Sequence, residues 1–241
     1  MSRRIRIGTA GWSIPRGSAH RCAPNGTHLS RYASMFSCVE INSSFYRSHA
    51  GKTYARWAAS TPPDFRFAVK VPQTITHERR LRAPRLLLER FLDETSALGA
   101  RRGPLLVQLP PSLTFEPAVV TRFFECLRQR FTGAVVCEPR HQTWTSERAD
   151  ALMRRYQVAR VAADPPRAAG LEAPGGWPDT VYFRLHGSPR TYWSSYTTAY
   201  LDALANHVSL ASPADVWCIF DNTAAGAAFE NAWELSGTIG R

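Results

Sequence analysis

The chain has 241 residues, 44% of them hydrophobic, which is enough for one large core or two small domains. It contains no run of about 18 apolar residues, and no apolar segment follows the paired arginines near its start, so neither a membrane span nor a signal sequence is expected. The net charge of +11 favours an anionic partner, either nucleic acid or a phosphorylated or carboxylated small molecule. We expect one cytoplasmic domain over residues 1–241.

Eight stretches are expected to form strands, because apolar residues alternate in them or fill them: 5–12, 38–42, 65–71, 105–109, 134–138, 158–163, 181–186 and 215–220. Helices are expected between them, at 28–36, 53–60, 84–98, 116–130, 146–156, 197–208 and 225–235, with Thr27 as the cap of the first. The segment that follows the sixth strand, up to Asp179, is rich in Pro and Gly, and no full helix is expected there.

Strands and helices that alternate every 30 residues or so, roughly the length of one βαβ unit, predict a closed parallel TIM-type (β/α)8 barrel. One of its helices, after strand six, is expected to be replaced by a loop. An open doubly wound sheet is the alternative. That fold places a glycine-rich phosphate turn after the first strand, and Gly8-Thr9-Ala10-Gly11-Trp12 does not match its pattern.

Polar residues occur at the exits of these strands in a consistent register. A period of two places nine of them on the inner face or at the exit: Glu40, Asn42, Lys70, Gln108, Glu138, Asp164, Arg184, His186 and Asp221. In a barrel all nine converge on the C-terminal mouth, which predicts a functional site there. The alternative is a structural ion network, although burying such charges is a costly way to gain stability.

The residue types at this mouth fit proton transfer beside an anion. Glu138 is a candidate general acid or base, and Arg184 a candidate clamp for a carboxylate or phosphate. Lysine occurs only at Lys52 and Lys70, and Lys70 is a candidate proton donor, electrophile or Schiff-base amine. The turns at 187–188 and 222–226 follow strands seven and eight, where barrels often hold phosphate.

A metal ion is a second possibility, because Glu40, Glu138, Asp164, His186 and Asp221 are oxygen and nitrogen ligands. Lys70 and Arg184 would repel a dication at the same place, so no metal is assigned, and no cofactor follows from the sequence. The five cysteines make no C-x-x-C pair, and most lie in apolar strands, so reduced buried thiols are expected rather than a nucleophile.

The loops predicted at the same end combine cations with aromatic side chains, namely Arg79, Arg80, Arg140, His141, Trp144, Arg190, Tyr192, Trp193 and Tyr196. Such a set is typical of a surface that binds single-stranded nucleic acid by phosphate contact and base stacking. It is equally compatible with the rim of a pocket for one nucleotide or sugar, or with aromatic cover over a core edge.

Several motifs together resemble the YecE-like family, domain of unknown function 72. They are Gly8-Thr9-Ala10-Gly11-Trp12-Ser13, Val39-Glu40-Ile41-Asn42-Ser43-Ser44-Phe45-Tyr46-Arg47, Phe67-Ala68-Val69-Lys70, Val107-Gln108-Leu109-Pro110-Pro111-Ser112, Cys137-Glu138-Pro139-Arg140-His141, Arg184-Leu185-His186-Gly187 and Phe220-Asp221-Asn222-Thr223. The resemblance runs through nearly the whole chain and implies a TIM-type barrel but no established activity. The loop at Ile14-Pro15-Arg16-Gly17 departs from the family, which usually has an aromatic-rich stretch there.

The leading hypothesis is an enzyme that uses acid–base chemistry on a small anionic substrate at the barrel mouth. Its candidate catalytic residues are Glu40, Lys70, Glu138, His186 and Asp221, and its candidate substrate-binding residues are Asn42, Tyr46, Gln108, Arg140, Arg184 and Asn222. The alternative is a non-catalytic nucleic-acid-binding protein that uses the basic, aromatic loops.

Overall fold

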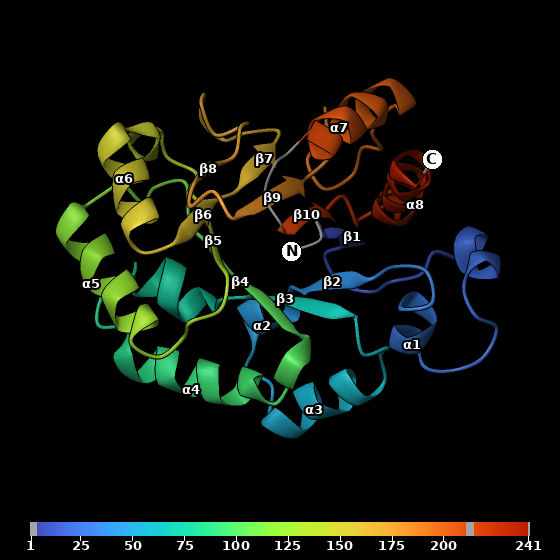
Figure 1. Ribbon diagram of the computed structural model, residues 1–241, viewed down its shortest axis with the longest axis horizontal. Coiled ribbons are helices and arrows are strands. Elements are labelled where there is room, and N and C mark those ends of the chain that lie inside the picture. The colour runs from blue at the N-terminus through green and yellow to red at the C-terminus, as the bar shows by residue number, and fades with distance from the viewer. Residues whose placement is uncertain (1–3, 211–214, 241) are drawn as a thin grey trace.

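The computed structural model describes residues 4–210 and 215–240, and it gathers the strands in the middle with the main helices outside them (Figure 1). The strands are β1 (Arg4–Thr9), β2 (Cys38–Ile41), β3 (Arg66–Lys70), β4 (Arg102–Gln108), β5 (Val135–Glu138), β6 (Val158–Arg160), β7 (Ala162–Asp164), β8 (Gly175–Gly176), β9 (Thr180–Leu185) and β10 (Asp215–Phe220). The helices are α1 (His28–Tyr32), α2 (Ser43–Tyr46), α3 (Gly51–Ala59), α4 (Arg85–Ser96), α5 (Pro117–Arg128), α6 (Glu147–Arg155), α7 (Thr198–Leu210) and α8 (Ala227–Ile239).

The strands form two hydrogen-bonded sheets. One has the order β1-β10-β9-β7 and is parallel throughout. The other has the order β2-β3-β4-β5-β6-β8 and is parallel except for β8, a two-residue strand antiparallel to β6. The fold is therefore an α/β fold with mixed, mainly parallel sheets.

The single closed barrel predicted from the strand count is not found as one continuous ladder. The two sheets approach each other at both edges. On one side an isolated parallel bridge joins Ala10 to Glu40, and the Gly11 amide donates a hydrogen bond to the Glu40 carbonyl at 2.8 Å. On the other side the predicted sixth strand is divided at Val161, so that β6 belongs to one sheet and β7 to the other.

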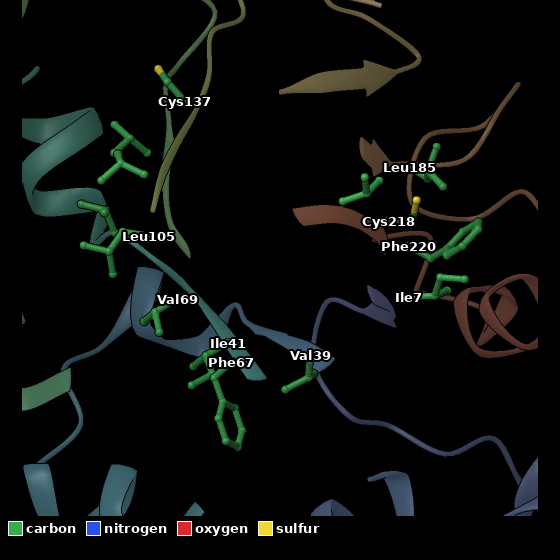
Figure 2. Close-up of a cluster of buried hydrophobic side chains, with 14 of the residues drawn as sticks. Ile7, Val39, Ile41, Phe67, Val69, Leu105, Cys137, Leu185, Cys218 and Phe220 are labelled. Atoms are coloured by element: carbon green, nitrogen blue, oxygen red, sulfur yellow. The ribbon is translucent and has the colours of Figure 1, made fainter. Parts of the chain in front are cut away.

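The apolar residues of the strands alternate between two separate clusters. The larger cluster lies between the strands and the helices, and Figure 2 shows side chains of it such as Val69, Leu105 and Phe220. The smaller cluster comprises Ala10, Cys38, Ala68, Leu106, Val136, Ala159, Val161, Tyr182, Trp217 and Ile219. Because its members come from strands of both sheets, the two sheets share one interior. The predicted period of two is confirmed by this division.

The helical segments lie close to the predicted ones, with boundaries shifted by a few residues. Thr27 caps α1 as expected, because its hydroxyl accepts a hydrogen bond from the Ser30 amide at 3.1 Å. Residues 165–179 contain no helix and only the short strand β8. Within 4–210 and 215–240, no helix is long and apolar enough to cross a membrane.

The loop that departs from the family pattern contains a 3-10 turn over Arg16–Arg21. It packs against α8, because the Ser18 hydroxyl donates to the Glu230 carboxylate and the Arg21 guanidinium lies 3.7 Å from the Trp233 ring centre. This loop is thus held against α8.

Candidate functional site

Arg184 on β9 lies at the centre of a buried ion cluster. Its Nη2 lies 2.8 Å from Glu40 Oε1 and 3.0 Å from Asp221 Oδ2, and its Nη1 lies 3.0 Å from Glu138 Oε2. The Gln108 side-chain carbonyl also accepts from Nη1, at 3.4 Å. Arg184 is 0% exposed, and all three of its guanidinium nitrogens have partners, since Nε donates to Glu40 as well. It holds carboxylates from three other strand ends in fixed positions.

Glu138, at the end of β5, is the carboxylate with the most cationic neighbours. Besides Arg184 it accepts a 2.7 Å hydrogen bond from Arg140 Nε, and His186 Nε2 lies 3.2 Å away. Burial alone would raise the pKa of Glu138, but Arg140, Arg184 and His186 outweigh it and hold this pKa well below its usual range. Glu138 is therefore ionised at neutral pH, which suits a group that accepts hydrogen bonds better than a general acid.

His186 lies between two carboxylates just after β9. Its Nδ1 is 3.0 Å from Asp221 Oδ2, and its Nε2 faces Glu138. Burial favours the neutral ring, but the two carboxylates outweigh it and raise the pKa of His186 above its ordinary value. The same pairing, with Arg184, lowers the pKa of Asp221 against the opposing effect of its burial. The two carboxylates therefore fix the orientation of the imidazole and favour its protonated form.

Lys70, at the end of β3, lies beside this cluster in a different kind of environment. Its Nζ donates to Asn42 Oδ1 at 3.0 Å and lies 4.1 Å from the centre of the Phe45 ring. Burial, followed by repulsion from Arg184, lowers the pKa of Lys70 to about 8, although Glu40, Asp221 and Glu138 act in the opposite direction. An amine with this pKa exchanges its proton readily near neutral pH.

Burial separates the predicted site residues into a deep group and an outer group. Glu40 and Arg184 are both 0% exposed, whereas Lys70 and Asp221 retain 5% and His186 retains 3% of their surface. The Arg140 side chain is 9% exposed. Solvent therefore reaches the outer group, whereas Glu40 and Arg184 lie beneath its reach.

Three of the predicted residues lie outside this cluster. Tyr46 is 67% exposed and contacts Phe45 edge to face. Asn222 is buried, and its amide donates to Ser194 O and Asn231 Oδ1, so it braces the chain between β10 and α8. Asp164 accepts from the Tyr196 hydroxyl at 2.8 Å.

Three further residues belong to the site although the sequence did not single them out. The Tyr182 hydroxyl donates to Glu40 Oε2 at 2.9 Å, and its shared register with Arg184 was the available signal. Phe45 supports the Lys70 amine, and the His77 ring packs edge to face on Phe45 with ring centres 4.9 Å apart. Burial, followed by the charges of Lys70 and Arg140, lowers the pKa of His77 to about 4, so this ring is neutral at physiological pH.

The aromatic residues predicted for the mouth loops have unequal exposure. Trp144 is buried, its indole donating to the Leu113 carbonyl, and Tyr196 is buried too. Tyr192 and Trp193 are exposed, and the Tyr192 ring meets His186 edge to face at 5.6 Å. Trp144 and Tyr196 are thus core residues, and Tyr192 is a cover over the histidine.

In the two turns predicted to hold phosphate, the amides of both glycines are already bonded. The Gly187 amide donates to the Tyr196 hydroxyl at 2.8 Å, and the Gly226 amide donates to the Thr223 carbonyl at 3.1 Å. Both glycines have positive φ, which explains the choice of residue by backbone conformation. The two glycine amides are therefore not free donors for an anion.

The side chains of 4–210 and 215–240 include no group of three or more His, Cys, Asp or Glu arranged to hold a metal ion. All five cysteines are free thiols, and four of them are buried. Burial raises the pKa of Cys38 and of Cys137, which keeps these thiols protonated and unreactive.

Sequence comparisons with known proteins agree on one family. The family model described as "Protein of unknown function DUF72" matches residues 6–241. The UPF0759 protein YecE of Escherichia coli is 36% identical over 140 residues, which is 57% of this chain; the chain spans 48% of that relative's length. The UPF0759 protein YunF of Bacillus subtilis is 23% identical over 262 residues, covering 96% of this chain and 93% of YunF.

Solved structures of the family share the fold. A DUF72 family protein from Enterococcus faecalis has a TM-score of 0.84 at 22% identity, covering 99% of this chain and 96% of that one. Another, from Thermotoga maritima, has a TM-score of 0.79 at 25% identity, covering 98% of this chain and 99% of that one. With the family model matching nearly from end to end, this chain belongs to the DUF72 family of proteins of unknown function.

Proposed function

We propose that this protein is an enzyme that binds a small anionic substrate above the Arg184 cluster and acts on it by proton transfer. We further propose that residues 1–241 form one domain, in which the two sheets are the halves of a TIM-type barrel and the site is its C-terminal mouth. The shared interior cluster and the Ala10–Glu40 bridge support the barrel.

The charge count of the cluster is the observation that carries the proposal. Its carboxylates are Glu40, Glu138 and Asp221, and its cations are Lys70, Arg140, Arg184 and His186. When Lys70 and His186 both hold their protons, the buried site has one positive charge in excess, which a bound anion would neutralise. Anion binding is therefore expected to stabilise the protonated forms of both residues.

Two outer cations are placed to meet the anion. Arg140 Nη2 is buried and lies 2.7 Å from Glu138 Oε1, but it has no hydrogen-bond acceptor among the described residues. Lys70 has spare donor capacity beyond its bond to Asn42. Arg140 and Lys70 are thus our candidates for direct contact with a carboxylate or phosphate.

The remaining residues divide between chemistry and support. Lys70, His186 and Asp221 are the proposed proton carriers. Glu138 stabilises the positive charge of His186, and Gln108 accepts a hydrogen bond from Arg184. Glu40 and Arg184 are fully buried and paired with each other, so we assign them positioning roles. Asn42 orients the lysine amine.

The proposal is tested by thermal unfolding with inorganic phosphate, 2-phosphoglycolate and lactate at constant ionic strength. A ligand at 100 times its dissociation constant should stabilise the protein by about 2.7 kcal/mol. We expect stabilisation of the wild type, and little or none in Arg140→Gln measured against its own ligand-free state. Arg122→Gln removes the same charge from an exposed position on α5 and should respond as the wild type does.

Calorimetric titration of the stabilising anion in two buffers of different ionisation enthalpy measures proton uptake. Near pH 8 we expect a fraction of a proton to be taken up in the wild type, because the anion stabilises protonated Lys70. Equal stabilisation of Arg140→Gln and Arg122→Gln, or binding without proton exchange, would contradict the proposed site.

A further inference from the structure

The chain has only two lysines, and they occupy opposite environments. Lys52 is an exposed residue of α3, whereas Lys70 lies at the end of β3 inside the candidate site with 5% of its surface exposed. Lys and Arg together number 30, so the other 28 are arginines. Arginine supplies a positive charge at any pH, but it supplies no nucleophilic amine.

Lys70 also differs from the other cations of the cluster in its partners. Arg140, Arg184 and His186 each lie within 3.2 Å of a carboxylate oxygen. Among the residues that the structure describes, no ion pair within 4.0 Å joins Lys70 to a carboxylate. Its nearest polar partner is the neutral amide oxygen of Asn42, at 3.0 Å.

The backbone and side chain of Lys70 are nevertheless held firmly. The Ser44 hydroxyl donates to the Lys70 carbonyl at 2.7 Å and to the Ile41 carbonyl at 2.9 Å, which ties α2 to the ends of β2 and β3. The Phe45 ring then supports the amine from one side. A fixed, buried amine without a counter-ion is arranged to lose its proton rather than to form a salt bridge.

We propose that Lys70 is a nucleophile that forms an imine with the carbonyl carbon of an anionic aldehyde or ketone. This rests on the proposed function and narrows its substrate class to small carbonyl compounds that carry a carboxylate or phosphate. The lowered pKa of the amine, about 8, agrees with this role, because the unprotonated fraction at neutral pH far exceeds that of an ordinary lysine.

The step balances without an added oxidant or reductant. The ammonium of Lys70 first gives one proton to water. The lone pair of Nζ then forms the C–N bond while the carbonyl π electrons move to oxygen. The two hydrogens left on nitrogen depart with that oxygen as water, and an imine remains. The Asn42 carbonyl accepts from the amine at the start. We assign the proton transfers to and from the departing oxygen to Asp221, whose charge acts on Lys70, and to its partner His186.

Reductive capture tests the inference. The full-length protein is treated at pH 7 with cyanoborohydride and one of three probes: formaldehyde, pyruvate or glycolaldehyde phosphate. Intact mass and peptide mapping then assign the adduct to Lys70, Lys52 or the terminal amine. We expect formaldehyde to modify Lys70 at least about tenfold faster than Lys52. The two anionic probes should each leave one reduced adduct on Lys70, and lactate, an anion with no carbonyl group, should leave none.

Three variants show which lysine forms the adduct and whether Arg140 contributes to capture. Lys52→Met should give the same adduct as the wild type, and Lys70→Met should give none at this site. Arg140→Gln should slow capture of the anionic probes more than capture of formaldehyde, because only the former use the anion contact.

Each outcome has a definite meaning. Faster or equal modification of Lys52 by formaldehyde, or an anionic carbonyl that stabilises the protein without being captured, overturns the imine. In either case stabilisation by phosphate would leave the proposed anion site intact, with Lys70 as a proton carrier or electrostatic contact. Failure of both capture and anion binding would remove the proposed function as well.

Discussion

Lys70 is expected to lower the stability of the fold that contains it. Its pKa is about 8 in the folded protein against an ordinary 10.5, so folding disfavours the protonated amine. Between these two pKa values the unfolded chain binds more protons than the folded one, and stability rises with pH. Below pH 8 the penalty is complete, and it disappears as the pH approaches 10.5.

Lys70→Met should therefore be more stable than the wild type at pH 7, by about 1 to 3 kcal/mol in the free energy of unfolding. The gain should fall below about 1 kcal/mol at pH 10, where the folded wild type has lost the proton. Urea unfolding at both pH values measures it, with Lys52→Met as the control that should change little. A variant that is less stable than the wild type to the same extent at both pH values would show that packing, and not charge, governs this position.

At the residue scale the sequence predicted the members of the cluster but not their roles. The period of two brought Glu40, Lys70, Glu138 and Arg184 to one end of the strands, because alternation fixes the face of each side chain. It could not reveal that Arg184 is fully occupied by carboxylates. Which cation is left without a carboxylate depends on distances between side chains 28 to 144 residues apart, and no local pattern contains that information.

At the element scale, the approach of β1 to β2 depends on the absence of a side chain at Gly8. A Cβ atom there would lie far inside van der Waals contact with the Cys38 carbonyl oxygen, and also 3.0 Å from its sulfur. Backbone atoms cannot move aside as a flexible side chain can. This approach lies two residues before the Ala10–Glu40 bridge, so it helps to bring the two sheets together.

Gly8→Ala should consequently lower the free energy of unfolding by about 1 to 3 kcal/mol, the usual cost of overpacking. Gly17→Ala is the matched control, because a Cβ at that position meets nothing within 4 Å. Its effect should stay within about 0.5 kcal/mol of zero. Urea denaturation of the three proteins decides the matter, and equal stabilities would mean that the β1–β2 junction tolerates a wider spacing.

Element prediction succeeded where a long periodic segment carried the signal and failed for single turns. The last strand was predicted at 215–220 and is β10 with the same bounds. The helix α2 over Ser43–Tyr46 was missed, because four residues are too few to show a helical period. The sixth strand was predicted as one segment, and its division at Val161 arises from which neighbours each half finds.

At the scale of the whole molecule, the alternation of strands and helices correctly predicted an α/β fold with mainly parallel strands, but the closed barrel that we expected is not found as one ladder in the described residues. Sequence spacing indicates parallel strands, because each parallel return requires a crossover, but it predicted eight strands where residues 4–210 and 215–240 form ten, one of them antiparallel. Whether two edges join by a ladder or by one bridge depends on the twist and stagger of all the strands together. The single bridge at Ala10 is a collective result of that kind.

The net charge of +11 is also a property of the whole molecule, and it bears on the nucleic-acid alternative. Two of the four aromatic residues predicted for the mouth loops, Trp144 and Tyr196, are buried and not available to stack on bases. Trp193 is exposed, but the Arg190 guanidinium already lies 4.3 Å from its ring centre. Tyr192 is 37% exposed, but its ring packs edge to face on His186. We therefore expect any affinity for nucleic acid to come mainly from general charge attraction.

A short single-stranded oligonucleotide is accordingly expected to bind weakly, with an affinity that falls by roughly two orders of magnitude or more between about 50 and 200 mM salt. Trp193→Ala should leave this affinity unchanged within about twofold, whereas one lost stacking contact would cost about 1 to 3 kcal/mol. Glu138→Gln should not weaken it either, because it removes a negative charge. Fluorescence anisotropy with a labelled oligonucleotide measures all three proteins. Salt-resistant binding that Trp193→Ala abolishes would instead identify an aromatic nucleic-acid surface and displace the small-anion enzyme as the leading interpretation.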